Sequence, residues 1–295
     1  MTSAPADHVT RLTAHAKLTI GLRITGVRDD GFHLIDAEMV TLALADTLTI
    51  TEPAAAGGSA AAGGSAAAGG SGGSSGPDES DGSGGSCGSG GSGGSMDVSG
   101  RYADGVPTDD DNLVIRALRL TGRNASVHLD KQIPHGGGLG GGSADAAAVL
   151  RWAGWTPTPE RLTAAASLGA DIAFCLAGGR ARVRGIGEQI TPLPHLDREF
   201  TLVIPPVRVS TPAAYRRWDE LGGPTAAGPN DLEPAAISLE PELARWRDSI
   251  GDATGRCPVL AGSGATWFVH GHHAEALEHL TRSDARIVVT RTVAA

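Results

Sequence analysis

Residues 131–148 read KQIPHGGGLGGGSADAAA, a glycine-rich run that leads directly into an alanine-rich segment. Alanine is the strongest helix former, so a helix is predicted from about Ala144 onward. Glycine lets the backbone N–H groups of a loop approach a ligand closely, and the N-terminus of a helix carries partial positive charge. A glycine loop that opens into a helix is therefore typical of an anion site, and the anion expected here is phosphate.

The identity of the phosphate ligand is less clear from the loop alone. The glycines from Gly136 to Gly141 fit the dinucleotide spacing G-x-G-x-x-G, which is a weak signal by itself. Pro134 and His135 separate the loop from the preceding strand, and Ser143 is not preceded by lysine as a Walker A loop requires. A nicotinamide-dependent oxidoreductase remains an alternative, which an antiparallel N-terminal sheet would exclude.

Composition excludes several classes of protein. The chain has 295 residues, a formal net charge of −9 and a pI of about 5.5, whereas a nucleic-acid binder needs a basic face. No apolar run approaches the roughly 18 residues of a membrane span, and the N-terminus lacks the apolar core of a signal peptide. Cys87, Cys175 and Cys257 show neither disulfide nor metal spacing. We therefore expect a cytoplasmic protein without nucleic-acid or membrane partners.

Lysine is rare in this chain. Of its 24 basic residues, only Lys17 and Lys131 are lysines. An ammonium is a compact point charge, whereas the guanidinium of arginine is a planar fork. Either the two lysines escaped the arginine bias by chance, or both positions require an ammonium.

Residues 54–95 form a low-complexity tract that begins with three copies of AAAGGS. Such a composition cannot offset the entropy lost on ordering, so we predict a flexible insertion in a loop. Because closure entropy rises slowly with loop length, the insertion is predicted to be tolerated and dispensable. A tether for a partner is the alternative.

The rest of the chain is predicted to be an α+β fold, because strands and helices mix without strict alternation. Asp46 is expected to interrupt the strands between residues 33 and 51, and Asp110, Asp111 or Asn112 is expected to cap the first helix. Strands are expected at 15–27, 33–51, 125–133, 180–193, 199–206, 267–270 and 286–293. Helices are expected at 113–121, 144–155, 157–178, 210–221, 241–250 and 272–282.

These motifs together resemble the GHMP kinase superfamily, and most closely its 4-diphosphocytidyl-2-C-methyl-D-erythritol kinases of the non-mevalonate isoprenoid route. The run 131–148 follows the family pattern almost without change. Other matching segments are 14–20, 26–33, 112–117, 168–174, 209–211, 230–233 and 262–266. The resemblance implies a two-lobed α+β fold: an S5-like, ATP-binding N-terminal lobe over 1–155, including the insertion, and a ferredoxin-like C-terminal lobe over 156–295.

The resemblance also implies a small-molecule kinase that uses ATP. Asp171 matches the general base, and Lys17 matches the ammonium that orients it and offsets charge at the γ-phosphate. Asn112 and Lys131 match positions that contact the nucleoside of ATP. The remaining implied ATP-binding residues are Pro134, Gly136, Gly137, Gly138, Leu139, Gly140, Gly141, Gly142 and Ser143. Mg²⁺ is expected with ATP, but no ligand for it is identified.

The acceptor side departs from the family pattern. Its implied residues are Thr19, Phe32, His33, Thr211, Gly262, Ser263 and Gly264, with Phe32 and His33 at the cytosine. Thr19 replaces an asparagine, and Phe32 replaces a tyrosine. A paralogue with a changed acceptor and a non-catalytic nucleotide-binding protein therefore remain alternatives. The expected ligands are ATP and the acceptor. A second copy of the chain, in a homodimer, is a further possible partner, for which the sequence contains no signal.

Overall fold

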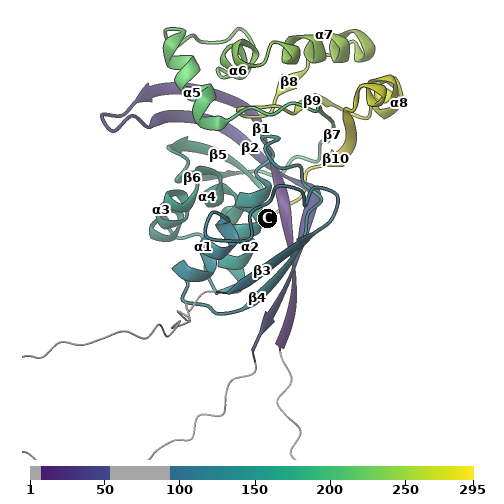
Figure 1. Ribbon diagram of the computed structural model, residues 1–295. Coiled ribbons are helices and arrows are strands. Elements are labelled where there is room, and N and C mark those ends of the chain that lie inside the picture. Colours follow the sequence, from purple (N-terminus) through teal and green to yellow (C-terminus); the bar gives the residue numbers. More distant parts are fainter. Residues whose placement is uncertain (1–7, 54–93) are drawn as a thin grey trace, which may run out of the picture.

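The computed structural model describes residues 8–53 and 94–295. These residues form the two-lobed α+β fold that the sequence predicts, with one sheet in each lobe (Figure 1). Within the described ranges, no helix has the length and apolar character needed to cross a membrane. The predicted insertion lies outside the described residues except for Gly94 and Ser95.

The N-terminal lobe contains a six-stranded sheet of order β3-β4-β2-β5-β6, with β1 also paired to β2. Its strands are β1 (His8–Val27), β2 (His33–Glu52), β3 (Ser95–Ser99), β4 (Ser126–Asp130), β5 (Arg180–Gly185) and β6 (Gln189–Leu193). Strand β2 pairs antiparallel with β1, β4 and β5, while β3 and β4 are parallel. A dinucleotide-binding unit needs a parallel sheet around its loop, so this topology excludes the oxidoreductase alternative.

Four helices lie together on one side of the long β1–β2 pair (Figure 1). They are α1 (Leu113–Leu120), α2 (Gly141–Trp152), α3 (Pro159–Leu168) and α4 (Ala170–Ala177). Their buried side chains form the main core with the sheet, and alanines of α2 allow this close packing. The single helix predicted over 157–178 is wrong, because the backbone at Gly169 is extended and separates α3 from α4.

The C-terminal lobe has a four-stranded antiparallel sheet of order β10-β7-β9-β8. Its strands are β7 (Glu199–Ile204), β8 (Val259–Leu260), β9 (Trp267–His270) and β10 (Arg286–Arg291). Its helices are α5 (Thr211–Glu220), α6 (Glu233–Leu239), α7 (Glu242–Thr254) and α8 (Ala274–Leu277), the last followed by a 3₁₀ turn over Glu278–Ser283. The first strand of this lobe lies between the last and the third, which is the predicted ferredoxin-like order. Of these helices, only the short α6 was not predicted from the sequence.

Two further expectations need correction. The sheet of the first lobe extends to Leu193, so the boundary expected between residues 155 and 156 lies too early in the chain. Asp46 does not interrupt β2, which runs unbroken from His33 to Glu52. The carboxylate of Asp46 is fully buried, but it accepts hydrogen bonds from the backbone N–H groups of Gln132 and Ile133, so the strand tolerates it.

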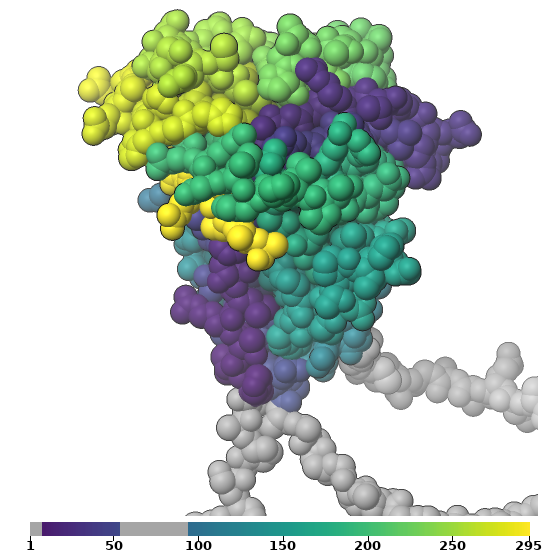
Figure 2. Space-filling model, turned by 180° about the vertical axis from the view of Figure 1, so that it is seen from behind, coloured from purple at the N-terminus to yellow at the C-terminus, as the bar shows by residue number. Residues whose placement is uncertain are grey.

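Strand β1 joins the two lobes. Atoms of the N-terminal strands appear at the lower end of the molecule and again at the top, beside the C-terminal helices (Figure 2). Ala16 and Leu18 belong to a core cluster that includes Phe200 and Phe268 of the second sheet. Successive side chains of a strand point to opposite faces. Lys17 and Thr19 therefore lie on the other face of β1, on the side of α2 and α4. The strand therefore carries one functional face and one core face.

We expect the insertion to be dispensable. Thr51 of β2 and Ser95 of β3 both pair with Ser126, on either side of it. Two strand spacings separate them, about 10 Å, which a turn of about six residues can span. Replacing 54–93 with a six-residue Gly/Ser turn should leave the melting temperature and kcat within error of the full chain. A fall in either quantity would mean that the tract packs or binds.

Candidate active site

Lys17 and Asp171 form an ion pair where β1 passes the start of α4. The Nζ atom of Lys17 lies 3.2 Å from Oδ2 of Asp171. The lysine side chain is 5% exposed and the aspartate side chain 33% exposed, so the carboxylate can be reached by a ligand while the ammonium is enclosed. Asp171 lies in the first turn of α4, where the helix dipole favours a negative charge. The two predicted catalytic residues are therefore adjacent.

The glycine loop packs directly on Lys17. The backbone N–H of Lys17 donates to the carbonyl oxygen of Leu139, at 3.0 Å. Gly140 is the N-cap of α2 with φ of 65°, and a Cβ there would lie 2.7 Å from Cγ of Lys17. Only glycine fits this contact and this backbone conformation. The first N–H groups of α2, which have no partner within the helix, are thereby brought next to the lysine and its aspartate.

A second glycine turn faces the first loop. A Cβ on Gly138 would lie 2.3 Å from the carbonyl oxygen of Ala261, so the two turns are in contact. The hydroxyl groups of Thr211 and Ser263 lie 2.8 Å apart. The second turn is held by Asn230, whose buried Nδ2 donates to the carbonyl oxygens of Leu260 and Gly262 at 2.9 and 2.6 Å.

Asn230 was not among the predicted site residues. The motif at 230–233 was noticed in the sequence, but the motif alone does not say which loop its amide supports. The structure shows that it supports the second glycine turn.

A cavity of about 530 Å³ opens in front of these groups. It brings together the two catalytic candidates, both glycine turns and the hairpin between β1 and β2. The predicted residues that line it are Lys17, Thr19, Phe32, His33, Gly138, Ser143, Asp171, Thr211, Gly262 and Ser263. Gly264 does not line this cavity; its predicted acceptor contact is not supported.

The far wall of this cavity is aromatic. Nε2 of His33 lies 2.8 Å from Oδ1 of Asp219, and the imidazole packs 4.7 Å from the ring of Tyr215 and 5.6 Å from that of Trp218. Burial raises the pKa of Tyr215, with the charge of Asp171 adding to the shift, so its hydroxyl stays protonated at neutral pH. Phe32 is 57% exposed at the hairpin turn and is free to cover a ligand.

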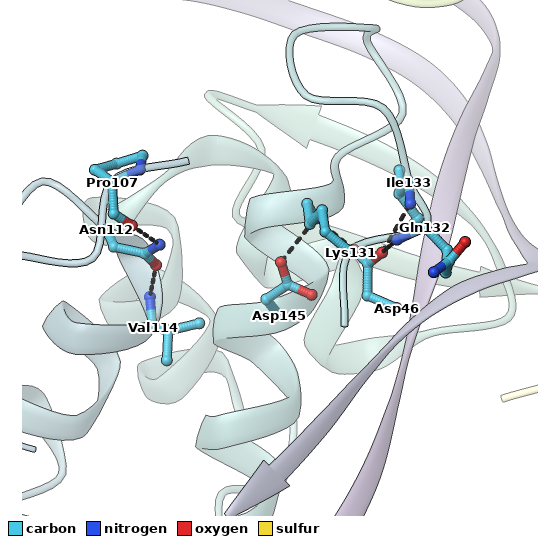
Figure 3. Close-up of polar contacts among 8 residues, drawn as sticks. All are labelled: Asp46, Pro107, Asn112, Val114, Lys131, Gln132, Ile133 and Asp145. Carbon is cyan, nitrogen blue, oxygen red and sulfur yellow. Dashed lines mark hydrogen bonds and ion pairs between the residues drawn. The ribbon is translucent and has the colours of Figure 1, made fainter. Parts of the chain in front are cut away.

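Lys131 does not line this cavity. Its side chain is 2% exposed and lies between the carboxylates of Asp46 and Asp145, 2.8 Å from Oδ2 of Asp145 (Figure 3). With both ion pairs formed inside the core, its ammonium is not available to a nucleoside. The implied nucleoside contact of this side chain is therefore not supported.

Asn112 is also engaged within the fold. Its Oδ1 accepts from the backbone N–H of Val114 at 2.8 Å, and its Nδ2 donates to the carbonyl oxygen of Pro107 (Figure 3). This is the N-cap of α1, one of the three caps that the sequence suggested. A nucleoside contact of its side chain is likewise not supported.

A second cavity of about 640 Å³ borders the other side of the glycine loop. Pro134, His135 and Gly137 line it from the loop, and three arginines line it from the surrounding segments: Arg101, Arg208 and Arg286. Burial, with the charges of Arg208 and then Lys131, lowers the pKa of His135, so this ring is neutral near pH 7. The lining also includes Asp104 and Asp284, so this side of the loop carries three arginines and two aspartates.

The remaining loop residues line neither cavity: Gly136, Leu139, Gly140, Gly141 and Gly142. Leu139 is fully buried in the cluster that joins the lobes, so its part in the loop is to anchor it. Within residues 8–53 and 94–295, no three His, Cys, Asp or Glu side chains group as a metal site.

Comparisons with known proteins identify the family of this chain. Residues 112–179 match the GHMP kinases N terminal domain. The chain is 35% identical over 278 residues to the 4-diphosphocytidyl-2-C-methyl-D-erythritol kinase of Paracoccus denitrificans, covering 88% of this chain and 85% of that protein. The corresponding kinase of Ruegeria pomeroyi is 33% identical over 294 residues, covering 90% of this chain and 91% of that protein.

Solved structures of GHMP kinases share the fold of this chain. A crystal structure of 4-(cytidine 5'-diphospho)-2C-methyl-D-erythritol kinase aligns with a TM-score of 0.65 and 26% identity, covering 96% of this chain and all of that one (100%). The mevalonate kinase of Methanococcus jannaschii, at 12% identity and a TM-score of 0.57, shares the fold over 98% of this chain and 99% of its own. The chain belongs to the 4-diphosphocytidyl-2-C-methyl-D-erythritol kinase family of the GHMP kinases.

Proposed function

We propose that the chain transfers the γ-phosphoryl group of ATP to a hydroxyl of 4-diphosphocytidyl-2-C-methyl-D-erythritol, in isoprenoid biosynthesis. The observation that carries this proposal is the Lys17–Asp171 pair, at 3.2 Å, between a glycine loop and a cavity large enough for a nucleotide-sized acceptor. Its assignment to this substrate follows the names of the relatives at 33–35% identity.

Each group in the site has a role in such a transfer. Asp171 takes the proton of the acceptor hydroxyl, whose oxygen then forms a bond to the γ-phosphorus. The bond from that phosphorus to its bridging oxygen breaks, and ADP leaves with the electron pair. Lys17 and the N-terminus of α2 offset negative charge on the transferred group, so catalysis consists of positioning and electrostatic stabilisation.

The loop fits the phosphates of ATP. The close contact at Gly140 leaves no room for a side chain, and Ser143 in the first turn of α2 lines the cavity, so the N-terminus of this helix adjoins it. We propose that Mg²⁺ enters with ATP, where it would neutralise phosphate charge; no protein ligand is assigned to it.

The acceptor fits the aromatic wall. A cytosine ring can stack on aromatic side chains, and His33 and Tyr215 offer such faces with Phe32 exposed beside them. The decisive assay is ATP turnover with a panel of acceptors, including the diphosphocytidyl compound, homoserine and mevalonate. Turnover only on another acceptor would support the changed-acceptor alternative, and ATP binding without any turnover would support the non-catalytic one.

Asp171→Asn should lower kcat by roughly 10²–10⁴-fold, because the amide keeps the shape of the side chain but cannot take a proton. The dissociation constant of ATP, measured by titration calorimetry without acceptor, should stay within about threefold of the parent. A kcat close to that of the parent would remove Asp171 from its role.

Lys17→Arg should lose nearly as much activity as Lys17→Met. The lysine stem lies against Gly140, where a Cβ would be 2.7 Å from Cγ of Lys17, and its Nζ already lies 3.2 Å from Oδ2 of Asp171. The longer side chain of arginine with its planar guanidinium would therefore displace the loop or the carboxylate. Steady-state kinetics of the two variants, at equal melting temperature, make the comparison. If Lys17→Arg keeps the parental rate, any positive charge suffices at this position.

Thr19→Asn should raise kcat/KM on the diphosphocytidyl substrate. The hydroxyl of Thr19 accepts from Nζ of Lys17 at 3.2 Å, which leaves one proton to donate to the acceptor. An asparagine amide can accept from the lysine and offer two N–H groups, and one recovered hydrogen bond in a closed site is worth roughly 5- to 150-fold. Thr19→Val, which lacks the hydroxyl, is the control. A lower kcat/KM for Thr19→Asn would show that threonine is a working alternative here.

A further inference from the structure

A buried charge cluster lies beneath the glycine loop and is not used by the proposed chemistry. It consists of Asp46 on β2, Lys131 after β4 and Asp145 on α2 (Figure 3). All three side chains are at most 2% exposed. Burial of an ionised group costs free energy because the group loses its hydration, so buried charges need partners that compensate for this loss. We call these three residues the charge triad.

The charge triad ties the loop to the sheet. Oδ1 of Asp46 accepts from the backbone N–H groups of Gln132 and Ile133, the residues that lead into the loop. Lys131 bonds to Asp46 on one side and to Asp145 on the other. A Cβ on Gly141, the first residue of α2, would lie 2.7 Å from Nζ of Lys131. The triad therefore fixes both the entry to the loop and the helix start that follows it.

The charge triad is not balanced. Two carboxylates face one ammonium, which gives a net charge of −1 when both are ionised. Oδ1 of Asp145 is buried and has no hydrogen-bond partner among the described residues. Burial raises the pKa of Asp145 to about 7, although the charge of Lys131 acts in the opposite direction. A proton on Asp145 would make the triad neutral.

Other charged groups near α2 do not change this imbalance. From β1 and α4, Lys17 and Asp171 contribute one charge of each sign. Cys175 on α4 is neutral, because burial raises the pKa of its thiol to about 12. The two arginines of α1, Arg116 and Arg119, are exposed to solvent. His135 in the loop has a pKa lowered by burial and is neutral near pH 7. Asp145 is therefore the member of the charge triad whose charge changes around neutral pH.

We propose that Asp46, Lys131 and Asp145 are positioning residues for the ATP loop, and that a proton on Asp145 strengthens ATP binding there. This inference rests on the proposed binding of ATP at the glycine loop. An ionised Asp145 places a buried negative charge behind the site of the phosphates, where the low dielectric of the interior preserves the repulsion. A protonated Asp145 removes that charge without moving the loop.

ATP affinity is expected to fall as the pH rises. ATP prefers the protonated form of Asp145, so its dissociation constant should rise as pH increases through about 7. The same group should also make the fold less stable as pH rises from about 4 to about 7, because the unfolded chain loses the proton first. Asp145→Asn is uncharged at every pH and should remove both effects.

The test is the dissociation constant of ATP, measured by titration calorimetry without acceptor at pH 6, 7 and 8. The terminal phosphate of ATP itself titrates near pH 6, so the parent is compared with Asp145→Asn at each pH. The ratio of parental to variant dissociation constant should rise about tenfold from pH 6 to pH 8. Asp252→Asn removes an exposed carboxylate from α7 and should follow the parent throughout.

Lys131→Met provides a second measurement. It leaves two buried carboxylates without a cation, so ATP affinity should fall, and Lys131→Met/Asp145→Asn should recover part of it. If Lys131→Met does not fold, the comparison of ATP dissociation constants between the parent and Asp145→Asn at the three pH values still tests the inference. Identical pH profiles for the parent and Asp145→Asn would overturn the inference, whereas a parent that binds no ATP at any pH would overturn the proposed function instead.

Discussion

The glycine loop touches two lysine side chains at consecutive residues, and the rest of the site depends on this contact. Gly140 lies on the stem of Lys17, and Gly141 lies on the ammonium of Lys131. Neither position has space for a single extra carbon. The start of α2 is thereby fixed between the catalytic ion pair on one side and the charge triad on the other. Because interiors are closely packed, a small displacement of either lysine would be transmitted to the loop.

The same contact explains why these two positions are lysines in a chain that otherwise uses arginine. Both ammonium groups are buried and face carboxylates. A glycine of the loop lies against the stem of Lys17 and another against the ammonium of Lys131. A guanidinium is wider and needs several hydrogen-bond acceptors in one plane, which neither space offers. The rarity of lysine was thus a structural signal, although it pointed to two different roles.

The sequence predicted what is encoded locally. The glycine loop, the candidate base Asp171 in the first turn of α4 and the ferredoxin-like second lobe were all recognisable from contiguous motifs. It could not predict which distant groups meet. Asp46 was expected to break a strand because its partners, Lys131 and two backbone N–H groups, lie 85 to 87 residues away. Asp219 pairs with His33 across 186 residues for the same reason and was missed.

The roles of Asn112 and Lys131 show a related difficulty. Their motif positions were correct, but a motif does not specify the direction of a side chain. Asn112 turns inward as a helix cap, and Lys131 turns into the core. The lobe boundary was placed too early because α3 and α4 have no sequence signal that assigns them to one sheet over the other. Their apolar residues pack in one core with strands β1, β2, β4 and β5 of the first sheet, which are distant from them in the sequence or follow them.

Strand β1 belongs to both cores, and this limits how the enzyme can open. Ala16 and Leu18 pack against the second sheet while Lys17, between them, faces the site. A hinge rotation that separated the lobes would have to pull this strand out of the core that it shares with the second sheet. Exchange of ligands therefore depends on smaller movements at the rim, above all on the exposed turn at 28–32. Lys17 and Asp171 both belong to the first lobe, so we expect their ion pair to stay assembled while the access to it varies.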